Sequence, residues 1–186
     1  MNFQIALIIK ILGLLLIFNC NNNSQIRHYK LEKKVTEFKN KTIPIFKEGI
    51  KWTPLNQWEV QPNSSMRIGS YKLPYSKGNG DLSIVKLGGT AGGLVANINR
   101  WRNQLNLEVH NESQMDRYIK IENSKIGNFK WLTLKSEVVD DDRAFLIAIF
   151  TIPNSSIFVK LNTTKIGIEE LVDEFVLFCK SFEIVD

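Results

Sequence analysis

Residues 144–150 of this chain read Ala-Phe-Leu-Ile-Ala-Ile-Phe, and every one of them is apolar. Successive side chains of a β-strand point to opposite faces of the sheet, so a strand without a polar face is covered on both sides. The run therefore predicts a central strand buried between two layers. Turn-forming residues bound it, with Asp140–Asp142 before it and Pro153–Ser156 after it.

Four other stretches predict strands around this central one. Residues 66–73 and 81–87 each alternate between apolar and polar positions, and the Gly-rich segment 74–80 between them is typical of a hairpin turn. Residues 129–135 and 157–161 are rich in β-branched, aromatic and other apolar side chains. The first two of these strands are predicted to form a hairpin and therefore to run antiparallel.

Helical spacing dominates in two segments. Residues 94–105 place Leu94, Ile98, Trp101 and Leu105 on one stripe, which is the pattern of a helix that packs on a sheet. The apolar residues of 168–182 follow the same spacing, and residues 112–118 predict a short additional helix. With 44% apolar and 23% charged residues, the composition is that of a folded domain. The predicted fold class is α+β, a sheet flanked by helices.

The segment Gly92–Gln104, Gly-Gly-Leu-Val-Ala-Asn-Ile-Asn-Arg-Trp-Arg-Asn-Gln, resembles a GGxxANxNRWRxQ block of uncharacterised bacterial lipoproteins. Residues 66–71 and 81–84 of the hairpin before it resemble the same family. The C-terminal strand, with the helix that ends at Phe178–Phe182, is similar to the close of that family and to the wider PsbP/Mog-type fold. The resemblance covers roughly residues 52–184. It implies an antiparallel sheet sandwiched between helices and a role in binding or assembly, and it supplies no catalytic motif.

The N-terminal part of the chain has the layout of an export signal. Residues 5–18 are apolar apart from Lys10 and Gly13. That run is shorter than the roughly 20 apolar residues of a spanning helix, and it fits the apolar core of a signal peptide, about 7–15 residues. Cys20 follows and polar residues come directly after it, which resembles a lipoprotein attachment site. The residue before the cysteine is Asn19, where such sites usually carry a small residue.

We therefore predict a lipoprotein signal peptide over residues 1–19 and lipidation of Cys20, which holds the protein at a membrane. An uncleaved N-terminal anchor helix is the alternative, and it tethers the chain in the same way. Residues 20–50 are then a basic tether, and residues 51–186 form a single domain. The predicted location is the bacterial cell envelope, on its periplasmic or surface-facing side, which excludes nucleic acid as a partner.

One polar surface is a candidate for binding. A loop with Gly88, Gly89, Gly92 and Gly93 leads into the helix, and glycines let backbone N–H groups approach an anion at a helix N-terminus. The alternative is that the glycines only permit a tight strand-to-helix turn. The candidate surface continues along the helix through Asn97, Arg100, Arg102 and Gln104. Arg100 could hold a carboxylate or phosphate, or make a structural contact instead.

Other motifs give weaker signals. The acidic run Asp140–Asp142 lacks the alternating oxygen ligands and glycine of a calcium loop and is expected to be a solvated turn. His28 and His110 are far apart, so neither zinc nor a catalytic triad is expected, and His110 is interpreted as a polar loop residue. Cys179 is expected to be a buried apolar residue. We predict no cofactor, no metal and no catalysis, and an envelope protein as partner. The alternative function is binding of a small anionic ligand through the Gly loop and Arg100.

Overall fold

The computed structural model describes residues 49–64 and 66–185, so the signal peptide, Cys20 and nearly all of the tether lie outside the described residues. Seven strands form one antiparallel sheet in the order β2-β3-β4-β8-β7-β6-β5. The strands are β2 (Glu59–Val60), β3 (Gly69–Tyr75), β4 (Gly78–Gly88), β5 (Lys120–Ser124), β6 (Gly127–Lys135), β7 (Arg143–Ile152) and β8 (Ser155–Thr164).

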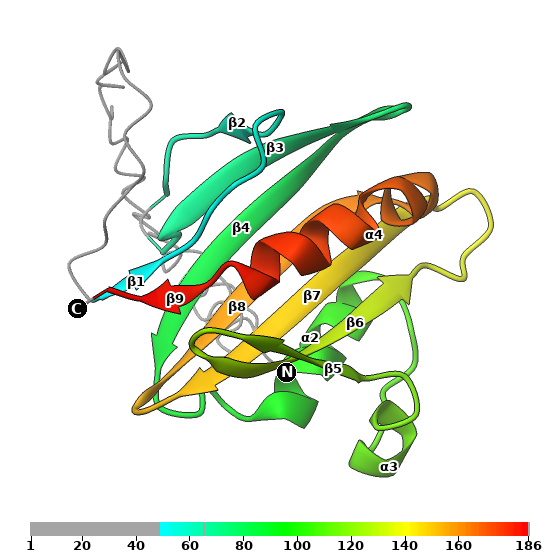
Figure 1. Cartoon of the computed structure of the whole chain (residues 1–186). Helices are drawn as coiled ribbons and strands as arrows, with labels where there is room; N and C mark the ends of the chain where they lie inside the picture. The colour runs from blue at the N-terminus through cyan, green and yellow to red at the C-terminus, as the bar shows by residue number, and fades with distance from the viewer. Residues whose placement is uncertain (1–48, 65, 186) are drawn as a thin grey trace, which may run out of the picture. The chain divides into compact units, whose positions relative to one another are not determined.

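Helices cover both faces of this sheet. Helix α4 (Lys165–Lys180) crosses one face, while α2 (Leu94–Gln104) and the single turn α3 (Glu112–Met115) lie on the other (Figure 1). A separate two-stranded ladder joins β1 (Ile50–Lys51) to β9 (Glu183–Ile184). The predicted α+β class, an antiparallel sheet flanked by helices, is confirmed. Within the described part of the chain, no helix combines the length and apolarity needed to cross a bilayer.

The central strand lies where its sequence predicts. Strand β7 runs between β8 and β6, and residues 144–150 are all buried. Ala144, Leu146, Ala148 and Phe150 pack on the α4 side, whereas Phe145, Ile147 and Ile149 pack on the α2 side. An apolar run without a polar face is thus divided between two cores, one on each side of the same sheet.

The larger of these cores lies under α4 and is aromatic. Phe182 stacks on Trp52 at a ring distance of 5.2 Å and on Phe150 at 4.8 Å, and Phe178 lies 4.8 Å from Trp58. The smaller core lies under α2, where Trp101 meets Phe158 edge-on at 5.7 Å. All four tryptophans are buried.

Three predicted boundaries were wrong, and one strand was not predicted. The turn expected over residues 74–80 is confined to Ser76 and Lys77, because Pro74 pairs with Asn79 inside the β3–β4 hairpin. Proline is tolerated there since β3 has no second neighbour at that position, and its missing N–H leaves no ladder bond unmade. Strand β5 was not predicted at all. Helix α4 begins at Lys165, with Thr164 as its cap, and α3 ends earlier than expected.

Candidate functional site

The Gly loop between β4 and α2 is shaped by backbone conformation. Gly89, Gly92 and Gly93 have φ of 62°, 86° and 86°, which favours glycine. A Cβ atom at any of these positions, or at Gly88, would meet no atom within 4 Å. The glycines are therefore explained by the turn rather than by crowding. The amide of Gly89 donates to the carbonyl of Asn154 at 2.8 Å, which ties the loop to the β7–β8 turn.

Asn97 holds the other end of this loop. Its side chain is buried, and Nδ2 donates to the carbonyl oxygens of Ala91 at 2.8 Å and Gly93 at 2.7 Å. The N-cap of α2 is Gly93, which makes no side-chain cap bond. Asn97, one turn later, joins the loop carbonyls to the helix by donating to them. Asn97 is thus a structural residue of the loop, although it also lines the space described next.

A hollow of about 410 Å³ lies between the start of α2 and the sheet. Its floor contains Ile149 of β7 and Phe158 of β8, both of the smaller core. We call it the α2 hollow, and its lining residues are Thr90, Gly93, Leu94, Asn97, Ile121, Asn128, Phe129, Lys130, Ile149, Thr151, Ser156 and Phe158. Its volume falls within the range of small-molecule sites, about 300–1,000 Å³.

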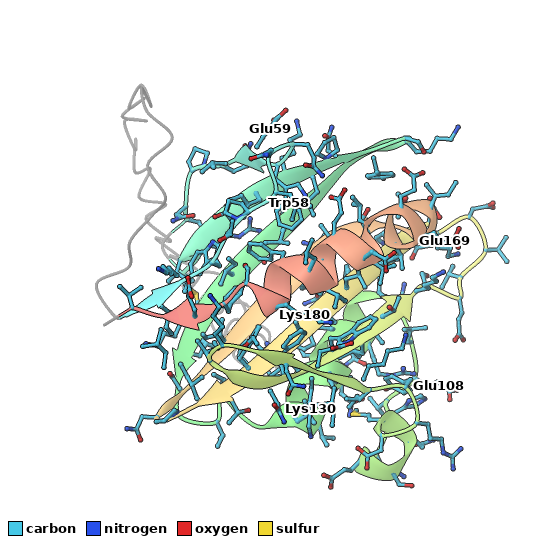
Figure 2. The ribbon with its side chains drawn as sticks, viewed as in Figure 1. Trp58, Glu59, Glu108, Lys130, Glu169 and Lys180 are labelled. Carbon is cyan, nitrogen blue, oxygen red and sulfur yellow. The ribbon has the colours of Figure 1, made fainter. Side chains whose placement is uncertain are left out.

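Lys130 is the cationic side chain of this lining. Its side chain is exposed on β6 and lies on the α2 side of the sheet. Leu132 and Leu134, the next residues of the same parity along the strand, lie on that side as well. Figure 2 labels Lys130 beside the β5–β6 hairpin, apart from Lys180 of α4. Lys130 makes no ion pair with any residue of the described chain. Its charge is therefore available to a ligand in the hollow.

The structure places Arg102 in a structural position. Its side chain is 7% exposed, and Nε donates to the carbonyl of Glu108 at 2.5 Å. A terminal nitrogen lies 2.9 Å from Nε2 of His110, whose Nδ1 lies 3.2 Å from the hydroxyl of Tyr118. The predicted binding surface is wrong at this residue, because a guanidinium that is buried and hydrogen-bonded within the domain is not accessible to a ligand.

His110 is more than a polar loop residue. Besides its ring contacts, its backbone N–H donates to Oδ1 of Asn99 at 2.9 Å, and its carbonyl accepts from Nδ2 of Asn99 at the same distance. These two reciprocal hydrogen bonds hold the segment after α2 against the helix. Both ring nitrogens are engaged in this network, so the histidine fixes the path of the chain.

Arg100 and Gln104 lie on the exposed side of α2, outside the α2 hollow. The guanidinium of Arg100 lies over the ring of Trp101, with its carbon 5.6 Å from the ring centroid. Gln104 accepts from Nζ of Lys160 at 2.6 Å. Burial, together with the charge of Arg100, lowers the pKa of Lys160 to about 8. The Gly loop and Arg100 therefore do not converge on one space.

The acidic turn is organised around Arg143. Its Nε and a terminal nitrogen donate to the two carboxylate oxygens of Asp141 at 2.8 and 2.7 Å. These hydrogen bonds, with a further one from Ser136, hold the pKa of Asp141 well below its usual range. Asp140 and Asp142 are exposed. Within residues 49–64 and 66–185, no three His, Cys, Asp or Glu residues gather as metal ligands.

Cys179 is fully buried in the larger core, and burial raises the pKa of its thiol. A thiol in this setting stays protonated and is a poor nucleophile. The interpretation of Cys179 as a buried apolar residue is confirmed.

No protein-family model matches the chain, and no curated protein matches it either. Solved structures with a similar fold include the cyanobacterial PsbP (CyanoP) of Synechocystis sp. PCC 6803, with a TM-score of 0.49 and 14% identity over 73% of this chain and 86% of that one. Another is LpqN of Mycobacterium tuberculosis, described as involved in cell envelope biogenesis, with a TM-score of 0.46 and 13% identity over 74% of this chain and 83% of that one. These likenesses concern the arrangement of the chain.

Most of the α2 hollow was not predicted from the sequence. Ile121, Lys130, Ile149 and Phe158 come from four different strands, and each was interpreted only as part of its strand or not at all. The available signal was indirect. Lys130 interrupts the apolar pattern of β6 on the face that otherwise carries Leu132 and Leu134, and such an interruption marks a position where the sheet is not covered.

Proposed function

We propose that this protein is a lipoprotein of the bacterial cell envelope, held at the membrane through Cys20, whose domain is a non-catalytic binding module. The observation that carries the binding role is the α2 hollow, an open space with the apolar floor Ile149 and Phe158. The groups that could act in catalysis support this view. His110 is engaged with Arg102 and Tyr118, and Cys179 is buried.

The lining of the hollow indicates the class of ligand. An apolar floor favours a hydrocarbon body, because burying apolar surface contributes roughly 25 cal/mol per Å². Lys130 at the rim favours an acidic group on that body, as a charge-assisted contact. We therefore propose a small amphiphile with a carboxylate or similar anionic head. Lys130 takes the role that the sequence interpretation gave to Arg100.

A photoreactive octanoic acid, with a diazirine in its alkyl chain, tests this proposal on the full chain in its native membrane. We expect mass spectrometry to place the label on peptides that contain Ile149 or Phe158. The matching photoreactive alcohol has the same body without the charge. Lys130→Gln should reduce labelling by the acid several-fold and leave labelling by the alcohol unchanged. Lys72→Gln, an exposed lysine on β3, serves as the control.

A second variant separates the hollow from the charge. Leu94→Trp places a larger side chain at the wall of the hollow and should abolish labelling by both probes. Labels spread over other surfaces, or labelling of Ile149 and Phe158 peptides that survives Leu94→Trp, would show that the hollow is not the site.

A protein partner remains the second candidate, and one observation favours it. Leu177 of α4 is 61% exposed, with a groove on each side of it. Leu55 lines one groove, of about 530 Å³, and Val176 lines the other, of about 430 Å³. The exposed leucine offers apolar surface that a partner protein would bury, and the two grooves beside it offer space for the partner's side chains.

In-cell crosslinking of the full-length protein, followed by mass spectrometry, tests the second candidate. A defined envelope protein crosslinked to α4 should be recovered with the wild type and lost with Leu177→Gln. Val139→Gln is the matched control, because Val139 is exposed on the β6–β7 turn, away from these grooves. Crosslinks that persist in Leu177→Gln would exclude α4 as the interface.

A further inference from the structure

Strand β5 ends the seven-stranded sheet, and only one of its two edges is paired. Its ladder partner is β6, and within the described residues no strand lies on its other side. Ile121, in the middle of this strand, is 62% exposed. A free edge offers a row of backbone N–H and C=O groups to another strand. The opposite edge of the sheet, β2, is only two residues long.

The hairpin register shows which backbone groups face outward. Residues of an antiparallel pair alternate between those bonded to the neighbouring strand and those that point away from it. The two-residue turn after β5 closes on the pair Ser124–Gly127, which is a hydrogen-bonding pair in such hairpins. Counting back from this pair, Glu122 and Lys120 face β6. Ile121 and Asn123 therefore direct their backbone groups to the free edge.

The side chains of the strand are divided between the two faces of the sheet. Lys120 lies on the α4 side, with Nζ 4.5 Å from the ring centroid of Trp131. Glu122 lies on the same side and pairs with Lys180 at 2.9 Å. Ile121 lies on the α2 side, at the rim of the α2 hollow. The edge thus presents a cation and an anion on one face, with an exposed apolar side chain between them on the other.

The order of charges along β5 makes the strand complementary to a second, antiparallel copy of itself. When two such strands pair antiparallel about Ile121, each Lys120 lies opposite Glu122 of the partner subunit. The alternative centre, Asn123, places Glu122 opposite Ser124 and leaves the charges unmatched. A centre at Glu122 would set two carboxylates against each other, and the backbone groups of Glu122 already face β6. Opposite charges across a strand pair attract, and like charges repel.

We propose that β5 pairs antiparallel with β5 of a second copy of this chain, with Ile121 opposite Ile121 of the partner subunit. The interface is isologous, so its twofold axis passes through the Ile121 pair, perpendicular to the sheet. The two sheets join into one continuous sheet, and the α2 hollows of both copies open on the same side. The proposal rests on β5 alone and does not depend on what the hollow binds.

Charge exchange at two positions tests this arrangement. Native mass spectrometry of the full chain, released from detergent micelles, should show a dimer for the wild type. Lys120→Glu puts carboxylates opposite one another, and Glu122→Lys puts ammonium groups opposite one another, so each variant alone should be monomeric. The double variant Lys120→Glu with Glu122→Lys restores the complementary order and should recover the dimer. Mixing the two single variants should yield heterodimers.

The double variant lacks the native contacts of Lys120 with Trp131 and of Glu122 with Lys180. If it nevertheless recovers the dimer, the loss of the dimer in the single variants is due to strand pairing and not to a damaged fold. Circular dichroism of each variant checks that the domain is folded, and Lys77→Glu, on the exposed β3–β4 turn, is the charge-matched control that should stay dimeric. A wild type that is monomeric at every concentration overturns the proposal. Single variants that remain dimeric, or a folded double variant that stays monomeric, overturn it as well.

Discussion

Arg102 and His110 are joined by a 2.9 Å contact between a guanidinium nitrogen and Nε2 of the imidazole. A guanidinium can only donate, so Nε2 is the acceptor, and the ring carries its proton on Nδ1, which points to the Tyr118 hydroxyl. One buried arginine thereby sets the tautomer of the histidine and fixes the path of the chain between α2 and α3.

Replacement of Arg102 by methionine should therefore destabilise the fold. The variant leaves the carbonyl of Glu108 and Nε2 of His110 without their donors, and an unsatisfied polar group of this kind costs about 1–3 kcal/mol. Urea unfolding measures the loss. Arg100→Met on the same helix is the matched control and should stay within about 0.5 kcal/mol, because Arg100 is exposed. Equal losses in both variants would contradict the structural role of Arg102.

The Gly loop gives a second prediction, which concerns backbone strain. Gly93 has φ 86° and ψ 163°, a region that is essentially restricted to glycine, so Gly93→Ala should cost about 1–3 kcal/mol. Gly88→Ala should cost far less, since Gly88 does not have a positive φ and a Cβ there has free space. Guanidinium unfolding of both variants compares them. A neutral Gly93→Ala would indicate that the loop relaxes and that its glycines serve another purpose.

Acid titration should reveal the Asp141–Arg143 contact. The pKa of Asp141 is held low chiefly by the hydrogen bonds from Arg143, whereas in the unfolded chain it is about 3.9. A carboxyl whose folded pKa is depressed stabilises the fold above the unfolded pKa and loses that contribution as the pH falls. The stability difference between the wild type and Asp141→Asn should be constant near neutral pH and shrink below about pH 4.

Asp140→Asn is the control for this titration, because Asp140 is exposed and forms no ion pair with any residue of the described chain. Its difference from the wild type should be small at every pH. A difference for Asp141→Asn that does not change with pH would mean that the two residues do not interact in solution.

Lys160 supplies the corresponding prediction at alkaline pH. Its pKa is lowered to about 8, first by burial and then by the charge of Arg100. Between about pH 8 and pH 10.5 the unfolded chain binds the proton that the folded chain has lost, so stability should rise with pH over this interval. Arg100→Met should move the pKa of Lys160 upward, as measured by NMR of the lysine side chain. An unchanged pKa would place Arg100 away from Lys160.

The sheet could be predicted where the pattern of side chains was uniform. Residues 144–150 are apolar at every position, and a strand with no polar face has only one place in a layered fold. Strand β5 could not be predicted this way. Its sequence, Lys-Ile-Glu-Asn-Ser, has a single large apolar residue, and that residue is exposed. A polar edge strand is defined by its pairing with β6, which local sequence does not encode.

The candidate site was predicted only in part. The sequence indicated the Gly loop and the start of α2, and Gly93 and Asn97 do line the α2 hollow. It placed Arg102 on the helix surface, because helical periodicity does not show that the following segment folds back over that flank. The carbonyl of Glu108 and the ring of His110, which bury the guanidinium, are brought there by the tertiary path of the chain.

The division of the interior by the sheet has a consequence for how the domain opens. In the described chain, the core under α4 has 22 buried residues and that under α2 has 11, with the strands between them. Local opening costs least where the fewest apolar contacts are broken. Amide hydrogens of α2 should therefore exchange with solvent earlier than those of α4. Local opening of α2 would then widen the hollow while the aromatic side stays folded.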